Sequence, residues 1–197
     1  MTSMSAVTII QKFKDLNLRF ITPSLLSSLL SQTNNNTLYK TLQRLEKNRI
    51  LTRLEKGKYL VTGAPVSEFS LANFLLQPSY VSLESALTYY GILPQFTYTI
   101  TSITTQRSQS ILSQNWEFAY SKISPRFFWG YIKQKDRLIA LPEKACLDYL
   151  YLASKGLKNS NIDEWDMSAI NQKRFSTYAR KIKFAPIQKL LITKNLL

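Results

Sequence analysis

The first 64 residues carry the hydrophobic pattern of three short helices. Residues 6–16 have apolar side chains at helical spacing, namely Val7, Ile10, Phe13 and Leu16. Thr22 followed by Pro23 predicts the start of a second helix, because a threonine hydroxyl can cap the first turn and proline suits the first helical position. A polar turn, TNNN at residues 33–36, separates this helix from a third one over residues 37–49.

The third helix is the most regular of the three, and a hairpin is expected after it. Leu38, Leu42 and Leu45 recur at i, i+4 and i+7 and form one narrow apolar stripe. Two β-prone runs follow, ILTRL at 50–54 and KYLVT at 58–62, and they are joined through Gly57. Helix, helix, turn, helix and hairpin is the order of a winged helix-turn-helix domain.

The side of the third helix opposite the leucines is polar and basic. With Leu38 as zero, Asn36, Lys40, Gln43 and Lys47 lie about 140–200° away around the helix. Amide side chains can read adenine edges, and lysine can read guanine or bind a phosphate. A polar face of this kind is also found on ordinary surface helices, but the element order and the basic hairpin favour DNA binding. The predicted DNA-binding residues are Asn35, Asn36, Tyr39, Lys40, Gln43, Arg44 and Lys47, with Lys56 and Lys58 at the tip of the hairpin.

The rest of the chain predicts a second domain with both helices and strands. A short connecting helix is expected over 68–77, and the stretch PSYVSLESALTYYGILPQ that follows reads as a helix. Ser82 is its expected N-cap, Glu84 lies in its first turn, and Gly91 and Pro94 end it. Strand candidates are FTYTITSITT, WEFAYSKIS, RFFWGYIKQ and RLIAL, at residues 96–105, 116–124, 126–134 and 137–141.

The C-terminal third is expected to be helical. Pro142 opens a helix that Gly156 closes, and residues 171–197 read as a helical tail in two pieces broken at Pro186. The sequence therefore predicts an α+β fold. Residues 1–64 form a winged helix-turn-helix DNA-binding domain, and residues 65–197 form a mixed α/β domain with a small, mostly antiparallel sheet.

The net charge indicates a polyanionic partner. The chain has 26 Lys and Arg against 12 Asp and Glu, a formal charge of +14. Such an excess is typical of proteins that bind nucleic acid or an anionic membrane surface. Residues 171–197 contain no acidic residue at all, so this tail is a candidate second nucleic-acid surface or simply a solvated face. The residues of that candidate surface are Lys173, Arg174, Arg180, Lys181 and Lys183.

The residue types argue against catalysis and metal binding. Histidine is absent and Cys146 is the single cysteine, which excludes Cys/His zinc sites, histidine triads and intrachain disulfides. We expect Cys146 to be a small buried hydrophobe. There is no glycine-rich phosphate loop. We therefore expect no catalytic residues, no metal and no cofactor, and we expect that the protein is not an enzyme.

The carboxylates do not form a recognisable catalytic set. Glu143 and Asp148 lie five positions apart, about 140° around a helix, so they do not converge. Asp163, Glu164 and Asp166 cluster in a polar segment next to Trp165. Glu117 and Lys144 would contribute to a nuclease site only if the fold brought them together.

No targeting or membrane segment is recognisable. The N-terminus lacks the basic and apolar regions of a signal peptide, and no stretch approaches the ~20 apolar residues of a membrane span. We expect a soluble cytoplasmic protein with no membrane partner.

Four pieces of the second domain, in order, carry a resemblance to a known family. They are YVSLESALTYYGILPQ, YTITSITTQR, FAYSKISPRFFWGY and IALPEKACLDYLYL, and they follow a hairpin that ends in Gly57-Lys58-Tyr59. Together they resemble the AbiEi-type antitoxins, which are the transcriptional regulators of type IV, abortive-infection toxin–antitoxin systems. The resemblance covers roughly residues 5 to 190.

The resemblance implies a protein with two activities. The winged helix would bind operator repeats in its own promoter and repress the operon, and the C-terminal domain would carry the antitoxin activity and assist DNA binding. The functional partner would be a nucleotidyltransferase-like toxin, opposed without a tight complex. The residues leave two alternatives open: a plain winged-helix transcription factor whose C-terminal domain dimerises or senses a signal, and an antagonist that binds RNA.

Overall fold

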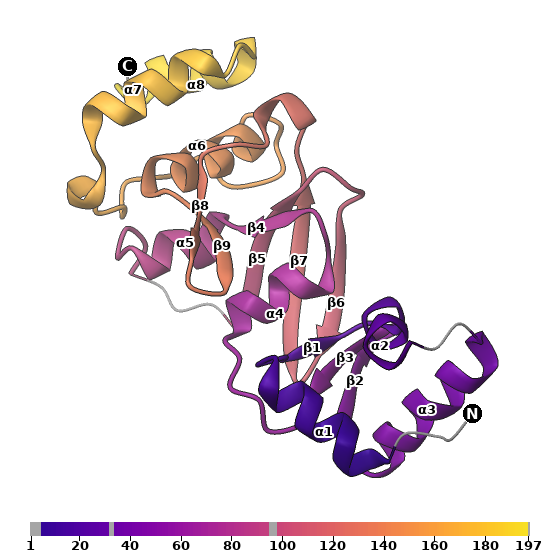
Figure 1. Cartoon of the computed structure of the whole chain (residues 1–197). Helices are drawn as coiled ribbons and strands as arrows, with labels where there is room; N and C mark the ends of the chain where they lie inside the picture. Colours follow the sequence, from indigo (N-terminus) through magenta and orange to yellow (C-terminus); the bar gives the residue numbers. More distant parts are fainter. Residues whose placement is uncertain (1–4, 32–33, 95–97, 197) are drawn as a thin grey trace. The chain divides into compact units, whose positions relative to one another are not determined.

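The computed structural model describes residues 5–31, 34–94 and 98–196 and has an α+β fold (Figure 1). The chain divides into two compact units, residues 1–67 (unit one) and residues 68–197 (unit two). Within the described ranges, no helix is both long and apolar enough to cross a membrane. Thr33 of the predicted turn, and Phe96 and Thr97 of the first predicted strand, lie outside these ranges.

Unit one consists of three helices and a three-stranded antiparallel sheet of order β1-β3-β2. Its elements are α1 (Ala6–Asp15), β1 (Phe20–Ile21), α2 (Pro23–Leu30), α3 (Asn35–Lys47), β2 (Leu51–Glu55) and β3 (Lys58–Val61). The two predicted strands and their hairpin are confirmed, with Gly57 at a positive φ of 72° in the turn. Strand β1 was not predicted, because two residues are too few to show a strand periodicity.

Side-chain caps start the helices of unit one. The Thr22 hydroxyl accepts a hydrogen bond from the backbone N–H of Leu25, and Pro23 occupies the first turn of α2, as predicted. Asn34 caps α3 by accepting from the N–H of Thr37. Helix α3 therefore begins at Asn35, two residues before the predicted start. The predicted turn at residues 33–36 is corrected accordingly: Asn35 and Asn36 belong to the first turn of α3.

The core of unit one is built around the α3 leucines. Leu38, Leu42 and Leu45 are all buried, which confirms the predicted stripe. The predicted apolar face of α1 is partly wrong, since Val7 is 76% exposed and Leu16 is 55% exposed. Phe13 is buried as predicted, but Ile9 completes the buried face of α1, which is rotated from the predicted one. The spacing of apolar residues over 6–16 therefore did not identify the full buried side of α1.

Unit two contains a six-stranded mixed sheet of order β6-β7-β5-β4-β9-β8 (Figure 1). The pairs β4–β9 and β5–β7 are parallel and the other three are antiparallel, so the sheet is more mixed than predicted. The strands are β4 (Ser79–Val81), β5 (Thr99–Thr104), β6 (Gln109–Ser113), β7 (Trp116–Lys122), β8 (Tyr131–Gln134) and β9 (Arg137–Ala140).

The helices of unit two cover this sheet and extend beyond it. They are α4 (Glu68–Leu75), α5 (Leu83–Tyr89), α6 (Pro142–Ala153), α7 (Gln172–Lys181) and α8 (Ala185–Thr193), with 3-10 turns η1 (Pro125–Phe127) and η2 (Met167–Ala169). Helix α6 packs against α5, α7 and α8. In Figure 1, α7 and α8 (yellow) lie on the side of α6 away from the sheet.

Several predicted elements of unit two need correction. The stretch 78–95 is not one helix: its first part forms the buried central strand β4, and α5 begins only at Leu83. The run 126–134 is a strand only in its last four residues. Strand β6 was not predicted. The tail does form two helices, but the break lies at residues 182–184, and Pro186 belongs to the first turn of α8.

Ser82 lies at the start of α5, as predicted, and Glu84 is in the first turn. Ser82 occupies the N-cap position, yet its hydroxyl makes no cap hydrogen bond. The Ser82 Oγ instead donates to Asp148 Oδ2 at 2.9 Å. Leu83 has a positive φ of 57°, which turns the chain from β4 into α5. Ser82 therefore hydrogen-bonds to α6 rather than to the first turn of α5, and rules based on neighbouring residues do not predict such a contact.

A buried polar cluster links β4 to α6. The Lys144 ammonium pairs with Asp148 one turn further along α6, and the two side chains are 0% and 1% exposed. Tyr80 in β4 accepts a hydrogen bond from Lys144 Nζ and donates one to Asp148 Oδ2, both at 2.9 Å. Together with the Ser82 hydroxyl, these contacts satisfy the charged groups inside the core. We call Tyr80, Ser82, Lys144 and Asp148 the core polar cluster.

Aromatic residues and a glycine enclose the core polar cluster. The Tyr80 ring stacks on Tyr131 at 4.6 Å between centroids and lies 4.9 Å from Phe128. The Lys144 stem passes so close to Gly130 that a Cβ there would lie 2.8 Å from the lysine Cγ. Gly130 also has a φ of 78°, which disfavours other residues. Position 130 is therefore restricted both by backbone conformation and by the lysine.

Desolvation dominates the electrostatics of the core polar cluster. Burial lowers the pKa of Lys144 and raises the pKa of Asp148, because both charged forms lose water, while their mutual attraction opposes both shifts. Burial also raises the pKa of the Tyr80 hydroxyl, and the neighbouring Asp148 charge adds to that effect. Neither charge is tolerated in the core without the other.

Replacing Lys144 by methionine is predicted to destabilise the protein by about 3–5 kcal/mol, because it leaves Asp148 buried without its cation. Urea unfolding followed by circular dichroism measures the loss. The matched control is Lys133→Met, at an exposed position in β8, which should change stability by less than about 0.5 kcal/mol.

The loss in Lys144→Met should also depend on pH. Without the lysine, burial holds the folded-state pKa of Asp148 above its unfolded value, so folding favours the protonated carboxyl and the penalty grows as pH rises through the folded pKa. The variant should therefore lose more stability relative to the parent at about pH 8 than at about pH 4. An equal loss at both values would contradict the ion-pair explanation.

Candidate nucleic-acid interface

The face of α3 opposite the leucine stripe is polar and solvent-exposed. We call it the α3 polar face. It comprises Asn36, Lys40, Gln43 and Lys47, with Tyr39 and Arg44 on its flanks, whereas Asn35, at the first position of the helix, lies nearer the leucine side. All are exposed except Arg44, which is half-buried on the flank. Tyr39 is 55% exposed. The structure therefore places six of the seven predicted α3 residues on one side of the helix, with Asn35 apart from them.

The start of α3 is electrostatically suited to an anion. Its first turn contains no acidic residue, and its backbone N–H groups provide the positive end of the helix dipole. Arg44 and Lys47 place positive charge in the last turn. The α3 polar face thus combines amides near the N-terminal end with cations further along, and so can hydrogen-bond both base edges and phosphates.

The hairpin tip contributes less charge than the sequence suggested. Lys56 is exposed in the β2–β3 turn, as predicted. Lys58, at the start of β3, is half-buried, and its ammonium donates to Glu55 Oε2 at 2.8 Å. This ion pair offsets one of the two predicted hairpin charges, so Lys56 carries the larger share of the positive potential at the tip.

The candidate residues of the tail lie on and just beyond α7. Helix α7 buries Phe175 and Ala179, and the five cations Lys173, Arg174, Arg180, Lys181 and Lys183 are exposed. We call these five residues the tail cations. Arg174 lies 3.5 Å from the buried carboxylate of Glu143, so one of the five is already engaged by an acid. The others face solvent without an acidic ion pair in the described part of the chain.

Two aromatic residues near the tail cations were not singled out from the sequence. Trp129 and Tyr178 pack edge to face, with ring centroids 5.0 Å apart. The Lys181 ammonium lies 5.6 Å from the centroid of Trp129 and 5.7 Å from that of Tyr178. The sequence gives little sign of this contact, because Trp129 precedes α7 by more than forty residues. Only the tertiary fold brings Trp129 beside Tyr178 and Lys181.

The carboxylates considered as catalytic candidates have separate partners or are exposed. Glu143 accepts from the backbone N–H of Asn171, whereas Asp148 pairs with Lys144, so the two acids face different partners, as predicted. Glu117, Asp163 and Glu164 are exposed. Asp166 accepts from the N–H of Ser168, which lowers the pKa of its carboxyl. Within residues 5–31, 34–94 and 98–196, no group of three His, Cys, Asp or Glu side chains could hold a metal.

Cys146 is fully buried in α6, as expected of a small core hydrophobe. Burial raises the pKa of its thiol well above the usual range, so the reactive thiolate is strongly disfavoured.

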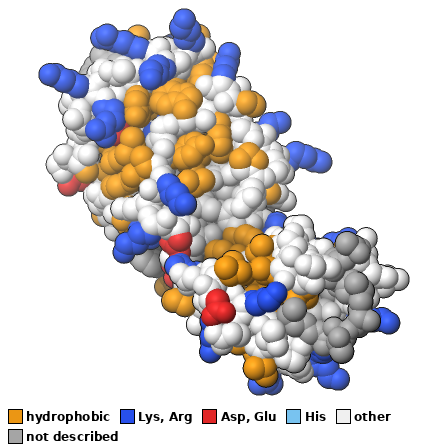
Figure 2. Space-filling view, in the orientation of Figure 1, with side chains coloured by type: hydrophobic (Ala, Val, Ile, Leu, Met, Phe, Trp, Pro, Cys, Tyr) orange, Lys and Arg blue, Asp and Glu red, His pale blue; other side chains and the backbone are white. Residues whose placement is uncertain are grey.

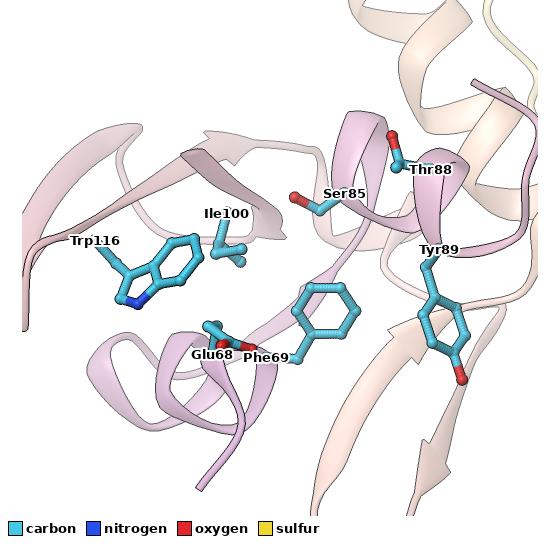
Figure 3. A pocket seen from close by; sticks show the side chains of 7 residues that line it. All are labelled: Glu68, Phe69, Ser85, Thr88, Tyr89, Ile100 and Trp116. Carbon is cyan, nitrogen blue, oxygen red and sulfur yellow. The ribbon is translucent and has the colours of Figure 1, made fainter. Parts of the chain in front are cut away.

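Unit two also has an aromatic pocket that the sequence did not indicate. It holds about 360 Å³ and lies between α4 and α5, with Phe69, Tyr89 and Trp116 on its walls and Ile100 on its floor (Figure 3). The carboxylate of Glu68 is the one acidic side chain among its lining residues. The Arg137 guanidinium lies over both Phe69 and Tyr89, at 5.3 and 5.0 Å from the ring centroids. Its mostly apolar lining contains no pair of groups suited to acid–base chemistry.

Comparison with known proteins adds no assignment. No protein-family model matches the chain, and no curated protein matches it.

The cap of α3 is predicted to support the candidate interface. Asn34→Ala removes the side-chain acceptor of the Thr37 N–H and should cost about 1 kcal/mol of folding stability. Thermal unfolding measures this loss. Asn36→Ala, two residues later on the exposed face, is the control and should stay within about 0.5 kcal/mol of the parent. Equal losses would mean that Asn34 does not act as a cap.

Proposed function

We propose that the chain is a DNA-binding transcriptional autorepressor and the antitoxin of a type IV toxin–antitoxin operon. Residues 1–64 act as a winged helix-turn-helix domain, with α2 and α3 as its helix-turn-helix and the β2–β3 hairpin as its wing. The observation that carries the DNA-binding part is the α3 polar face, exposed opposite a buried leucine stripe and followed by a basic hairpin.

The proposed contacts divide into base readout and phosphate binding. Asn36 and Gln43 are amides that can hydrogen-bond the N6 and N7 positions of adenine, and Lys40 and Lys47 can bind guanine or phosphate. Lys56 at the wing reaches the backbone or the minor groove. The formal charge of +14 supports attraction to duplex DNA at a distance, and this part of the affinity falls as salt rises.

The antitoxin part is supported by the resemblance of the second domain to the AbiEi-type family. The proposed partner is a nucleotidyltransferase-like toxin that is opposed without a stable complex. The protein works in the cytoplasm, on double-stranded operator repeats of its own promoter, and needs no cofactor for either role.

Operator binding tests the DNA assignment. Lys40→Ala/Gln43→Ala should weaken binding to a duplex of the gene's own upstream region more than tenfold, because each base contact contributes about 1–3 kcal/mol of discrimination. Gel shift and fluorescence anisotropy measure the change.

The control for operator binding is Gln11→Ala/Lys14→Ala. It removes the same two residue types from the exposed side of α1, with the same change of charge. It should leave binding within about twofold of the parent, since it alters only the long-range charge. Unchanged binding of Lys40→Ala/Gln43→Ala at moderate salt would reject the α3 assignment.

Co-expression tests the antitoxin assignment. The full chain, expressed from an independent promoter, should restore growth of cells that carry a nucleotidyltransferase-like reading frame encoded next to it. Lys40→Ala/Gln43→Ala should also restore growth, because neutralisation is assigned to residues 65–197 and repression to residues 1–64. If the full chain fails to restore growth although it is present at the same level as the toxin, the antitoxin assignment is wrong.

A further inference from the structure

We propose that unit two carries a binding surface for single-stranded nucleic acid, centred on Trp129 and flanked by the tail cations. This surface shares no residue with the α3 polar face and does not depend on the DNA-binding role of unit one.

The charge of this part of unit two favours a polyanion. Residues 171–197 contain seven Lys and Arg and no Asp or Glu. Helix α7 packs inward through Phe175 and Ala179, and its cations Lys173, Arg180 and Lys181 are exposed, while Arg174 reaches the buried Glu143 carboxylate. Figure 2 shows Lys and Arg side chains spread around hydrophobic side chains over the part of unit two that holds α7 and α8. Positive charge interleaved with apolar surface is the composition of surfaces that track a nucleic-acid strand.

Trp129 provides a ring on which a base can stack. It is half-buried, and its Nε1–H donates to the carbonyl of Arg126 at 3.1 Å. Tyr178 packs against it edge to face, with the ring planes at 82°. The two contacts fix the orientation of the indole before any ligand arrives, which reduces the entropy lost on binding.

The core polar cluster supports the indole from behind. The buried Lys144 ammonium lies 5.2 Å from the Trp129 ring centroid, and Lys144 is itself held by Asp148 and Tyr80. Because Lys144 is fully buried and Lys181 is exposed, Lys181 marks the side of the indole that solvent reaches. A base that stacks on this side takes the place of the Lys181 ammonium, which is then free to bind the adjoining phosphate.

The geometry favours a single strand over a duplex. Stacking on a protein ring requires a base that has left its own stack, which a duplex does not offer without distortion. Arg174 is held by Glu143 and Lys173 lies at the N-terminal end of α7. The tail cations at the other end are Arg180 and Lys181, with Lys183 just beyond the helix, and the Lys181 ammonium lies beside the ring. This spacing suits a strand that passes over Trp129 and continues along the end of α7.

The test measures binding of the full chain to oligo(dT), oligo(U) and a mixed-sequence duplex, each about 15 units long, by fluorescence anisotropy at several salt concentrations. The parent should bind both single strands, and the affinity contributed by unit two should be larger for the single strands than for the duplex, which unit one is itself proposed to bind. The two single-stranded probes distinguish DNA from RNA as the bound strand, because a preference for oligo(U) requires recognition of the 2′-hydroxyl or of uracil.

Arg180→Gln/Lys181→Gln/Lys183→Gln should weaken single-strand binding at least tenfold. It should also reduce the slope of log affinity against log salt by about 2, since each phosphate contact on a single strand contributes about 0.7. The matched control is Arg107→Gln/Lys122→Gln/Lys135→Gln, which removes the same charge from exposed positions of unit two away from α7. The control should stay within about twofold of the parent.

Variants of Trp129 test the stacking step separately from charge. Trp129→Ala should lose about tenfold in affinity with an unchanged salt slope, and Trp129→Phe should keep most of the affinity because it retains a ring. Thermal unfolding reports whether either variant is destabilised, and the phenylalanine variant keeps the test valid if the alanine variant does not fold.

Three outcomes would overturn the proposal. Equal losses in the α7 triple variant and its control would mean that only overall charge matters. Unchanged binding in both the Trp129→Ala and the Trp129→Phe variant would exclude stacking. Duplex binding as tight as single-strand binding, and equally sensitive to the α7 triple variant, would make this a duplex surface.

Discussion

The buried ion pair between Lys144 and Asp148 is the interaction on which unit two depends. Two charges inside a core are tolerated only when each compensates the other and their remaining hydrogen bonds are satisfied. Tyr80 and Ser82 meet that requirement from β4 and from the residue that follows it. The pair therefore fixes α6 against the middle strand of the sheet, and through Lys144 it also supports Trp129.

Unit one could be predicted closely because its signals are local. Thr22 with Pro23, the three leucines of α3 and Gly57 in the hairpin each determine structure within a few residues of themselves. The predictions that failed in unit one concern features that neighbouring residues alone do not determine. Asn34 could be recognised as a polar turn residue, but that it caps α3 and extends the helix by two residues depends on its backbone conformation. The exposure of Val7 follows from how α1 packs into the core of unit one, which periodicity alone does not determine.

The elements of unit two were harder to predict, because contacts between residues that are distant in the sequence determine them. The cap-like Ser82 bonds to Asp148 instead, and the residues before it form a central strand whose partners come from β5 and β9. From the sequence, Asp148 was considered with Glu143 and Lys144 with Glu117, whereas the fold pairs Lys144 with Asp148 inside the core. The candidates on α3 were selected from charge and helical phase and those of the tail from charge alone, whereas Trp129 joins Tyr178 only in the folded chain.

Gly130 has a consequence for how related sequences can diverge. Any side chain at this position would collide with the Lys144 stem, so a larger residue at 130 requires a shorter one at 144. A shorter residue at 144 in turn leaves Asp148 without its cation. Positions 130, 144 and 148 should therefore covary among homologues as one evolutionary unit, because a replacement at any one of them alone is disfavoured.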